Sequence, residues 1–316
     1  MWHIITAVAL FVTYKIYVKI LNCHSHHDAV LTGKVVIITG GSFGVGYKAA
    51  KDLAARGAKV ILGCRDLDKG RNAQEAIIKV TGNKNVAYRK LDLASLESVR
   101  RFVKDFKDSG TRLDILINNA GAVKTGTVHT NDDIVESLQV NYLGGFLLTV
   151  LLVPILKQSG NGRIVNVSSI LHRLGKMDLE KINCENVYNS FQMYCNSKFC
   201  NILFTKELAK RLSGTGVIVN SVEPGFIRTK TYSKNASLLE NLSYLVQKLF
   251  LKSSSEGAQT LLYLALSDEC EMVNGKHFSG CRETTISDKA EYGEMASKLW
   301  KFSEETVRLK CEETIM

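Results

Sequence analysis

Short apolar runs alternate with longer amphipathic stretches along most of this 316-residue chain. Runs rich in Val, Ile and Leu predict strands, and segments whose apolar residues recur with helical spacing predict the helices between them. The predicted strands are Val35–Thr39, Lys59–Gly63, Val86–Leu91, Leu113–Asn118, Arg163–Val167, Val217–Val222 and Lys276–Phe278. The predicted helices are Val45–Arg56, Asp68–Val80, Leu96–Lys107, Asn131–Lys157, Phe191–Leu212 and Ser254–Leu266.

Several of these strands are almost wholly apolar, including Val35–Ile38 and Ile115–Ile117. Strands covered by helices on both faces have this composition, which is typical of a parallel sheet. Strands and helices that alternate along the chain then predict an α/β fold. We therefore expect a single domain built on a doubly wound parallel sheet of the Rossmann type.

The N-terminal segment has a different pattern. Trp2–Tyr14 contains no Lys, Arg, Asp or Glu, and the apolar pattern continues to Leu21 past two lysines, Lys15 and Lys19. A helix of about 20 residues spans a bilayer, and lysine side chains near its end reach the interface by snorkelling. A membrane anchor is therefore predicted. The positive flank that follows it predicts, by the positive-inside rule, that the rest of the chain faces the cytosol.

A secretory signal peptide is the competing interpretation of this segment. No Lys or Arg precedes the apolar run, and no clear small-residue cleavage site follows it. Both features are expected of a signal peptide, so the anchor is favoured.

The charge balance adds little to this picture. With 41 basic and 31 acidic residues, the net charge is +10, but the basic residues are spread along the chain. Phosphates of a small cofactor or anionic lipids explain this excess more simply than nucleic acid, which is not predicted as a partner. The eight cysteines include no CxxC pair and predict free thiols in a reducing compartment. No metal site is predicted, the histidines at 24, 26 and 27 included.

A glycine-rich turn follows the first predicted strand, in Thr39–Gly46. Glycine permits a sharp turn and a close approach of the backbone to a pyrophosphate, and the next helix directs its N-terminal N–H groups at the phosphates. Its position between a strand and a helix is the context that a dinucleotide site requires. The residues expected to contact the cofactor here are Gly40, Ser42, Phe43, Gly44, Val45 and Gly46.

The end of the second strand bears on which dinucleotide is bound. Arg65 lies 19 residues after Gly46, where an NADP site offers a cation to the 2′-phosphate and an NAD site offers a carboxylate to the ribose. Arg65 favours NADP(H). Asp66 is adjacent, and NAD stays open if its carboxylate is directed at the ribose.

Tyr194 and Lys198 are four residues apart on a predicted helix, so they share one face. A phenol has a pKa of about 10, and a nearby ammonium group lowers it. Such a tyrosine would donate a proton to an alkoxide during carbonyl reduction and remove one during alcohol oxidation. The pair alone is weak evidence, since this spacing is common on helices.

Taken in order, these motifs resemble the short-chain dehydrogenase/reductase superfamily from about Thr32 to Gly280. The matching motifs are Thr39–Gly46, Asn118–Gly121, Ser169 and Tyr194–Lys198. Within the superfamily the sequence most resembles the retinol dehydrogenases. That likeness rests on Gly63–Asp66, Arg163–Ser169, Asn201–Thr205, Val222–Thr229 and the charged segment Lys298–Lys301.

The resemblance implies roles for individual residues. Tyr194, Lys198, Ser169 and Asn141 would be catalytic: Ser169 binds the substrate oxygen, Lys198 holds the nicotinamide ribose, and Asn141 stabilises a helix break and a water relay to Lys198. Ser168 is adjacent to Ser169, but alternation places the two on opposite sides. The further cofactor contacts implied are Asp92 at the adenine, then Asn119, Ala120, Gly121, Pro224, Gly225 and Thr229.

Two features depart from the retinol-active relatives. Many of those relatives carry histidine at the positions of Tyr142 and Gly145. The stretch Arg228–Leu251, the expected substrate lid, matches no retinoid-specific pattern. Both departures concern the substrate and leave the catalytic residues unaffected.

These patterns divide the chain into a membrane anchor (residues 1–21), a linker (22–33), a dinucleotide-binding catalytic domain (34–280) and a C-terminal helical extension (281–316). The function expected is an NADP(H)-dependent oxidoreductase of a lipophilic alcohol and its aldehyde or ketone, with retinol/retinal first. A steroid, isoprenoid or fatty aldehyde is the alternative substrate, and an NADP-binding scaffold or sensor is the non-enzyme alternative. The expected location is the endoplasmic reticulum membrane, facing the cytosol. Assembly into a homo-oligomer is left open.

Overall fold

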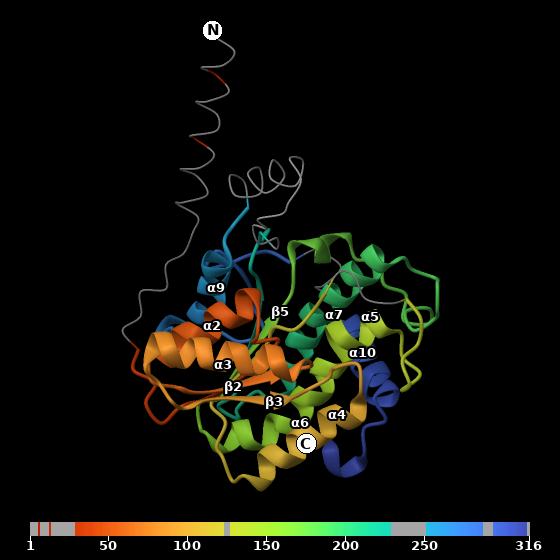
Figure 1. The fold of residues 1–316 in the computed structure, drawn as a ribbon. Helices are drawn as coiled ribbons and strands as arrows, with labels where there is room; N and C mark the ends of the chain where they lie inside the picture. The colour runs from red at the N-terminus through yellow and green to blue at the C-terminus, as the bar shows by residue number, and fades with distance from the viewer. Residues whose placement is uncertain are drawn as a thin grey trace.

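An eight-stranded sheet forms the centre of the molecule (Figure 1). The computed structural model describes residues 29–122, 127–228, 251–286 and 293–314, together with Thr6 and Thr13. The strand order is β3-β2-β1-β4-β5-β6-β7-β8, parallel except for the antiparallel β7–β8 pair. The strands are β1 (Val35–Thr39), β2 (Lys59–Cys64), β3 (Val86–Lys90), β4 (Ile115–Asn118), β5 (Arg163–Val167), β6 (Ile218–Glu223), β7 (His277–Ser279) and β8 (Arg282–Glu283).

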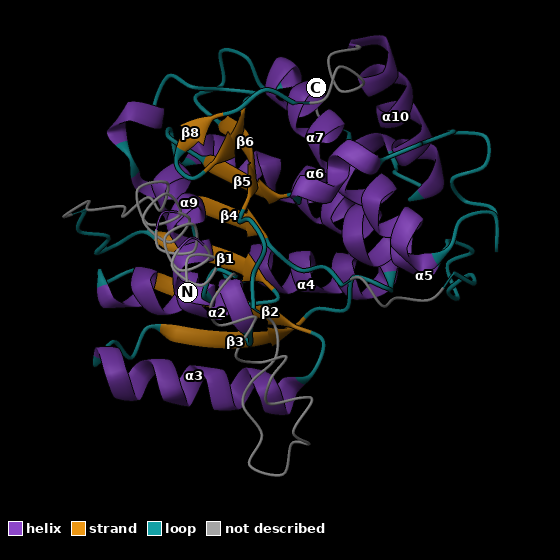
Figure 2. Ribbon diagram, turned by 90° about the horizontal axis from the view of Figure 1, so that it is seen from above, coloured by secondary structure: helices purple, strands orange, loops and turns teal. Residues whose placement is uncertain are grey.

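Helices cover both faces of this sheet (Figure 2). One face is covered by α2 (Gly44–Ala55), α3 (Leu67–Thr81) and α9 (Ser254–Leu266). The other is covered by α4 (Leu96–Asp108), α6 (Gly144–Gln158), α7 (Ser190–Arg211) and α10 (Gly293–Thr306). The shorter helical elements are α5 (Glu136–Leu138), η1 (Gln139–Leu143), η2 (Ile170–Leu174), η3 (Asp268–Cys270) and η5 (Cys311–Glu313).

Strand β1 is buried on both faces, which explains why its sequence is a continuous apolar run. Val35 and Ile37 belong to the hydrophobic core under α4, α6 and α7, whereas Val36 and Ile38 belong to the core under α2 and α9. Successive side chains of a strand point to opposite faces, so a strand with helices on both sides is apolar throughout. The chain leaves β1 for β2 on one side and returns as β4 on the other. Ligands of doubly wound sheets bind beyond the carboxyl ends of the strands at such a reversal.

The predicted doubly wound α/β fold is confirmed, and the observed strands begin and end within two residues of the predicted ones. The helix predicted over Asn131–Lys157 is wrong in its first part. A tight turn with Asp133 in the left-handed region (φ 64°) precedes α5, and η1 is a π-helical turn between α5 and α6. Apolar periodicity did not reveal this interruption, because both parts bury apolar side chains.

Helix α10 packs into the core of the sheet domain. Trp300 is buried there, with its ring 5.0 Å from that of Phe146 and 4.3 Å from the Arg211 guanidinium. The Ser303 hydroxyl lies 2.7 Å from the Tyr142 hydroxyl. The segment after residue 281, for which helix was predicted, contains helix α10. Strand β8, which was not predicted, precedes this helix.

The predicted membrane anchor lies outside the described residues apart from Thr6 and Thr13. Among the described residues, Glu136–Gln158 is long and apolar enough to span a membrane, but 78% of its apolar window is buried in the protein. We therefore assign that segment to the core. Free thiols are present at Cys64, Cys184, Cys195, Cys200, Cys270 and Cys311. Cys281 is disulfide-bonded, so the expectation of free thiols is wrong at that position.

Candidate active site

The glycine-rich turn has the backbone that its sequence predicted. Gly40 and Gly44 have φ values of +65° and +61°, a region that favours glycine. A Cβ atom on Gly46 would lie 2.4 Å from the Asn119 side-chain amide and 2.7 Å from the Gly40 carbonyl. Ser42 is hydrogen-bonded to Cys64 at the end of β2, where burial raises the pKa of the thiol and this bond opposes the rise. The turn is thereby fixed against two neighbouring strands.

The first turn of α2 is open to an anion. Its N-cap residue, Phe43, provides no side-chain hydrogen bond, and no acidic residue lies in the first turn that Val45 occupies. Unpaired N–H groups at a helix N-terminus attract phosphate. The residues present therefore fit a dinucleotide pyrophosphate.

Thr39 connects this turn to the end of β4. Its hydroxyl accepts hydrogen bonds from the backbone N–H groups of Asn119 (3.0 Å) and Ala120 (2.9 Å). The Asn119 side-chain amide donates to the carbonyls of Thr39 (2.9 Å) and Gly40 (3.3 Å). The Asn119 side chain thus holds the ends of β1 and β4 together.

The adenosine end of the predicted site contains exposed charges. Asp66 is the N-cap of α3: its carboxylate accepts from the Lys69 backbone N–H at 3.1 Å and pairs with the Lys69 ammonium at 3.2 Å. The backbone hydrogen bond from Lys69, followed by its ammonium, lowers the pKa of Asp66. Arg65 is exposed, and no carboxylate of the described residues forms an ion pair with it. Lys90 lies beside it and donates to the Arg65 carbonyl at 2.7 Å.

Asp92, expected at the adenine, has a local structural role. Its carboxylate accepts from the Ala94 N–H at 3.0 Å, and its own N–H donates to the Ser98 hydroxyl at 3.0 Å. This is an Asx turn that leads into α4. Contact with adenine would use the remaining carboxylate oxygen.

Tyr194 and Lys198 lie on one side of α7, with the Lys198 ammonium 5.6 Å from the centre of the Tyr194 ring. Lys198 is buried, its ammonium donates to the Val167 carbonyl at 3.0 Å, and burial lowers its pKa to about 8. Burial raises the pKa of Tyr194, against the expectation that Lys198 lowers it. The opposing interaction is a hydrogen bond with Ser169. In the protein alone the phenol is therefore held neutral.

The two adjacent serines have different partners, as alternation predicted. The Ser168 hydroxyl donates to the Lys198 carbonyl at 2.8 Å and is buried. Ser169 caps η2 through its side chain and contacts the Tyr194 phenol. Ser169 is thus the serine beside the tyrosine, and Ser168 fixes α7 to the end of β5.

Asn141 lies in the π-helical turn η1, so the expected helix break is present. Its side-chain oxygen accepts from the Ala122 N–H at 2.7 Å, and its side-chain nitrogen donates to the Ala122 carbonyl at 2.9 Å. The Asn141 backbone carbonyl accepts from the Asn201 side chain at 3.0 Å. Single π-turns inside helices are frequent at functional sites. Here the turn attaches to both β4 and α7.

Gly121 brings these groups together. A Cβ atom at this position would lie 2.9 Å from the Lys198 ammonium and 3.1 Å from the Asn141 side-chain oxygen. A side chain at this position would displace Lys198 or Asn141 from the segment after β4. This contact joins the motif after β4 to helix α7.

The chain bends beyond β6 at Pro224-Gly225, where Gly225 has a φ of +85°. The next residues are fixed by backbone hydrogen bonds between Lys252 and both Phe226 and Arg228, each 2.9 Å long. Thr229 and most of the expected lid lie outside the described residues.

Tyr142 and Gly145, the two positions where many retinol-active relatives carry histidine, differ in their surroundings. Tyr142 is fully buried among Phe146, Phe204 and the Ser303 hydroxyl, and burial raises its pKa well above the usual range. Its ring belongs to the core under α10. A Cβ atom on Gly145 would meet nothing nearer than 4.0 Å.

Comparison with known proteins places this geometry in a family. The family model for short chain dehydrogenase matches residues 34–238. The chain belongs to the short-chain dehydrogenase family. It is 44% identical to retinol dehydrogenase 12 of Bos taurus over 90% of each chain, and 46% identical to retinol dehydrogenase 11 of Mus musculus over 86% of each. The predicted resemblance is confirmed.

Solved structures of this family have the same fold. A protein of Mycobacterium paratuberculosis, described as uncharacterized, has a TM-score of 0.70 at 32% identity and covers 88% of this chain and 94% of its own. A structure from Escherichia coli, described as a short chain dehydrogenase complexed with NADPH, has a TM-score of 0.63 at 25% identity, covering 81% of this chain and 100% of its own. As a family member, this chain is an oxidoreductase that binds a nicotinamide cofactor.

Three residues that position the site were missed by sequence reasoning. Thr39 holds the end of β4, Ser168 holds α7, and Asn201 holds the π-turn. A signal existed for Asn201, which lies three residues after Lys198 and hence on the same helical face. The roles of Thr39 and Ser168 depend on contacts between distant segments.

Proposed function

We propose that this chain is an NADP(H)-dependent oxidoreductase that interconverts a lipophilic alcohol and its aldehyde or ketone, with retinol and retinal as the first pair. The observation that carries the proposal is the Tyr194 phenol, hydrogen-bonded to Ser169 with the Lys198 ammonium 5.6 Å from its ring. These are an acid, an oxygen-binding hydroxyl and a buried cation at one point, at the carboxyl end of the sheet.

The proton chemistry follows from these groups. The bound nicotinamide cofactor supplies or accepts the hydride. In reduction, Ser169 donates a hydrogen bond to the substrate carbonyl, and the Tyr194 O–H donates the proton that turns the developing alkoxide into an alcohol. The Lys198 ammonium then stabilises the phenolate that remains. In oxidation the same phenolate removes the alcohol proton.

The raised pKa of Tyr194 favours its action as an acid. Burial disfavours the phenolate, so the protonated form predominates near neutral pH. Lys198, with a pKa of about 8, is still mainly cationic there. Both protonation states suit carbonyl reduction.

The charges near β2 support NADP(H) over NAD(H). Asp66 is occupied with capping α3, whereas Arg65 is exposed with Lys90 beside it. A guanidinium suits the 2′-phosphate dianion, and a carboxylate would repel it. The NADPH in the Escherichia coli structure is consistent with this choice. The turn Gly40–Gly46 would hold the pyrophosphate, and Asp92, Asn119, Ala120, Gly121, Pro224, Gly225 and Thr229 the rest of the cofactor.

The retinoid substrate rests on the relatives. Several retinol dehydrogenases are 41–46% identical to this chain over most of its length. The test is a panel of carbonyls (all-trans-retinal, a steroid ketone, an isoprenoid aldehyde and a fatty aldehyde), each assayed with NADPH and NADH on the full chain in detergent. We expect the highest kcat/KM for retinal with NADPH. Good turnover of another carbonyl without turnover of retinal would contradict the retinoid assignment.

We further propose that residues 1–21 anchor the protein in the endoplasmic reticulum membrane, with the catalytic domain in the cytosol. A substrate dissolved in the bilayer would reach an anchored enzyme directly. The chain contains glycosylation sequons at Asn235 and Asn241. Their lack of glycans in cells, together with alkaline-resistant membrane association, is the expected result, and glycans at either site would contradict the orientation.

A further inference from the structure

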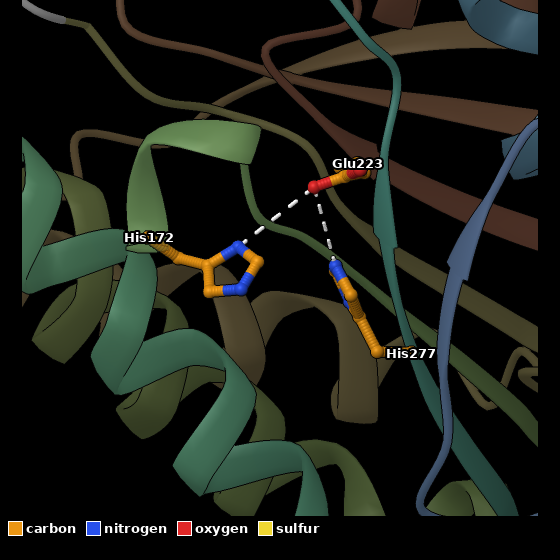
Figure 3. A group of neighbouring side chains, drawn as sticks. All are labelled: His172, Glu223 and His277. Atoms are coloured by element: carbon orange, nitrogen blue, oxygen red, sulfur yellow. Dashed lines mark ion pairs between the residues drawn. The ribbon is translucent and has the colours of Figure 1, made fainter. Parts of the chain in front are cut away.

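Three buried side chains from separate elements meet beside the carboxyl end of the sheet (Figure 3). His172 comes from η2, Glu223 ends β6, and His277 begins β7. Each offers one ligand atom, and these atoms lie within 4.8 Å of one another. The catalytic proposal uses none of the three.

The hydrogen bonds of the two imidazoles orient them toward the carboxylate. His172 Nδ1 lies 2.7 Å from the Ser169 carbonyl, which can only accept, so Nδ1 carries the proton. His277 Nδ1 lies 2.9 Å from the Ser221 hydroxyl. The Nε2 atom of each ring is buried and has no hydrogen-bond partner among the described residues. His277 Nε2 lies 3.5 Å from a Glu223 carboxylate oxygen, and the His172 ring approaches the same oxygen with its Nδ1 atom at 3.8 Å. An unpartnered polar atom in the interior is costly, and two such imidazole nitrogens beside one carboxylate indicate a missing partner.

The charge states suit a cation. Burial lowers the pKa of His172 to about 4, so at neutral pH its Nε2 presents a lone pair. Burial raises the pKa of Glu223, but its interactions with His277, 3.5 Å away, and with the nearby Arg173 outweigh this effect, and the net pKa is lowered. The cluster therefore offers the His172 Nε2 lone pair and the Glu223 carboxylate, with the unpartnered His277 Nε2 beside them.

We propose that His172, Glu223 and His277 bind one divalent transition-metal ion, of which Zn²⁺ fits best. Zinc takes imidazole nitrogen and carboxylate oxygen at about 2.0–2.2 Å, which puts tetrahedral ligand atoms about 3.3 Å apart. The Glu223 oxygen already lies 3.5 Å from His277 Nε2. The Ser169 carbonyl and the Ser221 hydroxyl serve as the outer partners that metal-bound histidines need.

Two cations compete with a metal for Glu223. The Arg173 guanidinium lies 3.3 Å from the same carboxylate oxygen, and Lys252 acts on it from further away. Arg173 is 39% exposed, so it has room to turn outward when a metal binds. The proposal revises the expectation that the chain has no metal site. Positions 172, 223 and 277 are more than fifty residues apart in sequence, so no motif signals them.

The test is zinc binding by the metal-stripped full chain in detergent. After equimolar Zn²⁺ and gel filtration, elemental analysis should find one equivalent retained by the wild type. H277Q and E223Q should each weaken binding on the order of 100-fold, and S221A about tenfold through its outer contact. Co²⁺ should give the visible absorption of a tetrahedral N/O site in the wild type only.

Two control variants remove other histidines. H24Q/H26Q/H27Q in the predicted linker and H129Q, at a partly buried position away from the cluster, should each still retain one equivalent of zinc. Far-ultraviolet circular dichroism checks that every variant is folded, and S221A serves if H277Q and E223Q do not fold. The proposal would be overturned if the linker variant lost its bound zinc, or if H277Q and E223Q retained as much zinc as the wild type. It would also be overturned if the folded wild type retained no zinc. Because the readout is metal content, it is independent of the proposed oxidoreductase activity.

Discussion

The two ends of the predicted cofactor site are built in different ways. At the proposed proton-transfer end, Lys198 and Asn141 are 3% and 4% exposed, and buried hydrogen bonds hold Lys198 to β5 and Asn141 to α7. At the adenosine end, Arg65 and Asp66 are exposed, and their interactions are local. A buried hydrogen-bonded network tolerates little change, whereas an exposed charge can be replaced at small structural cost. The chemistry should therefore be fixed by the fold, and the choice of cofactor by single surface residues.

Among the variants that test this difference between the two ends, replacement of the buried Lys198 should lower kcat the most. Lys198→Met keeps an unbranched side chain of similar length but removes the ammonium that stabilises the phenolate. We expect kcat to fall about 10²- to 10⁴-fold. Steady-state kinetics with NADPH would measure the change, with Lys210→Met, exposed on the same helix, as the matched control. A loss of less than about fivefold would contradict the role of Lys198.

A methyl group at Gly121 tests how tightly the proton-transfer end is packed. Its Cβ atom would lie 2.9 Å from the Lys198 ammonium and 3.1 Å from Asn141, so one of them must move. Because a displacement of about 1 Å can cost on the order of 100-fold, Gly121→Ala should lower kcat about 10- to 100-fold. The control is Gly145→Ala, where the nearest atom is 4.0 Å away. Equal kcat values for the two variants would show that this packing does not matter.

Arg65→Ala tests the adenosine end. Loss of a charge-assisted contact to the 2′-phosphate costs about 1.5–2 kcal/mol, so the Kd of NADPH should rise about 10- to 30-fold. The Kd of NADH should change less than about twofold, since NADH has no such phosphate. Fluorescence titration measures both, with Lys79→Ala, exposed at the far end of α3, as the control. Equal losses for the two cofactors would rule out the phosphate role.

The pH profile gives the mildest test, because it changes no residue. Lys198 loses its charge as pH rises through its pKa of about 8, so kcat/KM for reduction should fall about tenfold between pH 7 and 9. Tyr194, with its raised pKa, should stay protonated over this range. A flat profile to pH 9 would mean that the neutral lysine suffices.

The sequence predicted those features that depend on local spacing. The apolar runs located the sheet, the glycine turn located the phosphate end, and the i, i+4 spacing of Tyr194 and Lys198 placed both on one side of α7. The break at Asn141 came from family resemblance, since apolar periodicity continued through it. The fold and the grouping of Tyr194 with Lys198 on one side of α7 were therefore accessible without coordinates.

Features that depend on contacts between distant segments were not accessible in this way. Three such contacts join separate elements. Gly121 approaches Lys198, and Thr39 is hydrogen-bonded to the segment after β4. The third contact is the cluster of His172, Glu223 and His277. The pKa of Tyr194 was predicted in the wrong direction, because spacing shows the neighbouring charge but not the burial that opposes it. Solvent exclusion is a property of the folded chain.

The central claim is that Tyr194 transfers the proton, and Tyr194→Phe tests it most directly. The variant keeps the ring and removes only the hydroxyl, so NADPH should bind with a Kd within about threefold of the wild type. Single-turnover oxidation of that NADPH by all-trans-retinal, or by the best substrate of the panel, should slow about 10³-fold. The control is Tyr188→Phe, at a partly buried position before α7, which should react at the wild-type rate. Undiminished NADPH oxidation by Tyr194→Phe would contradict the account.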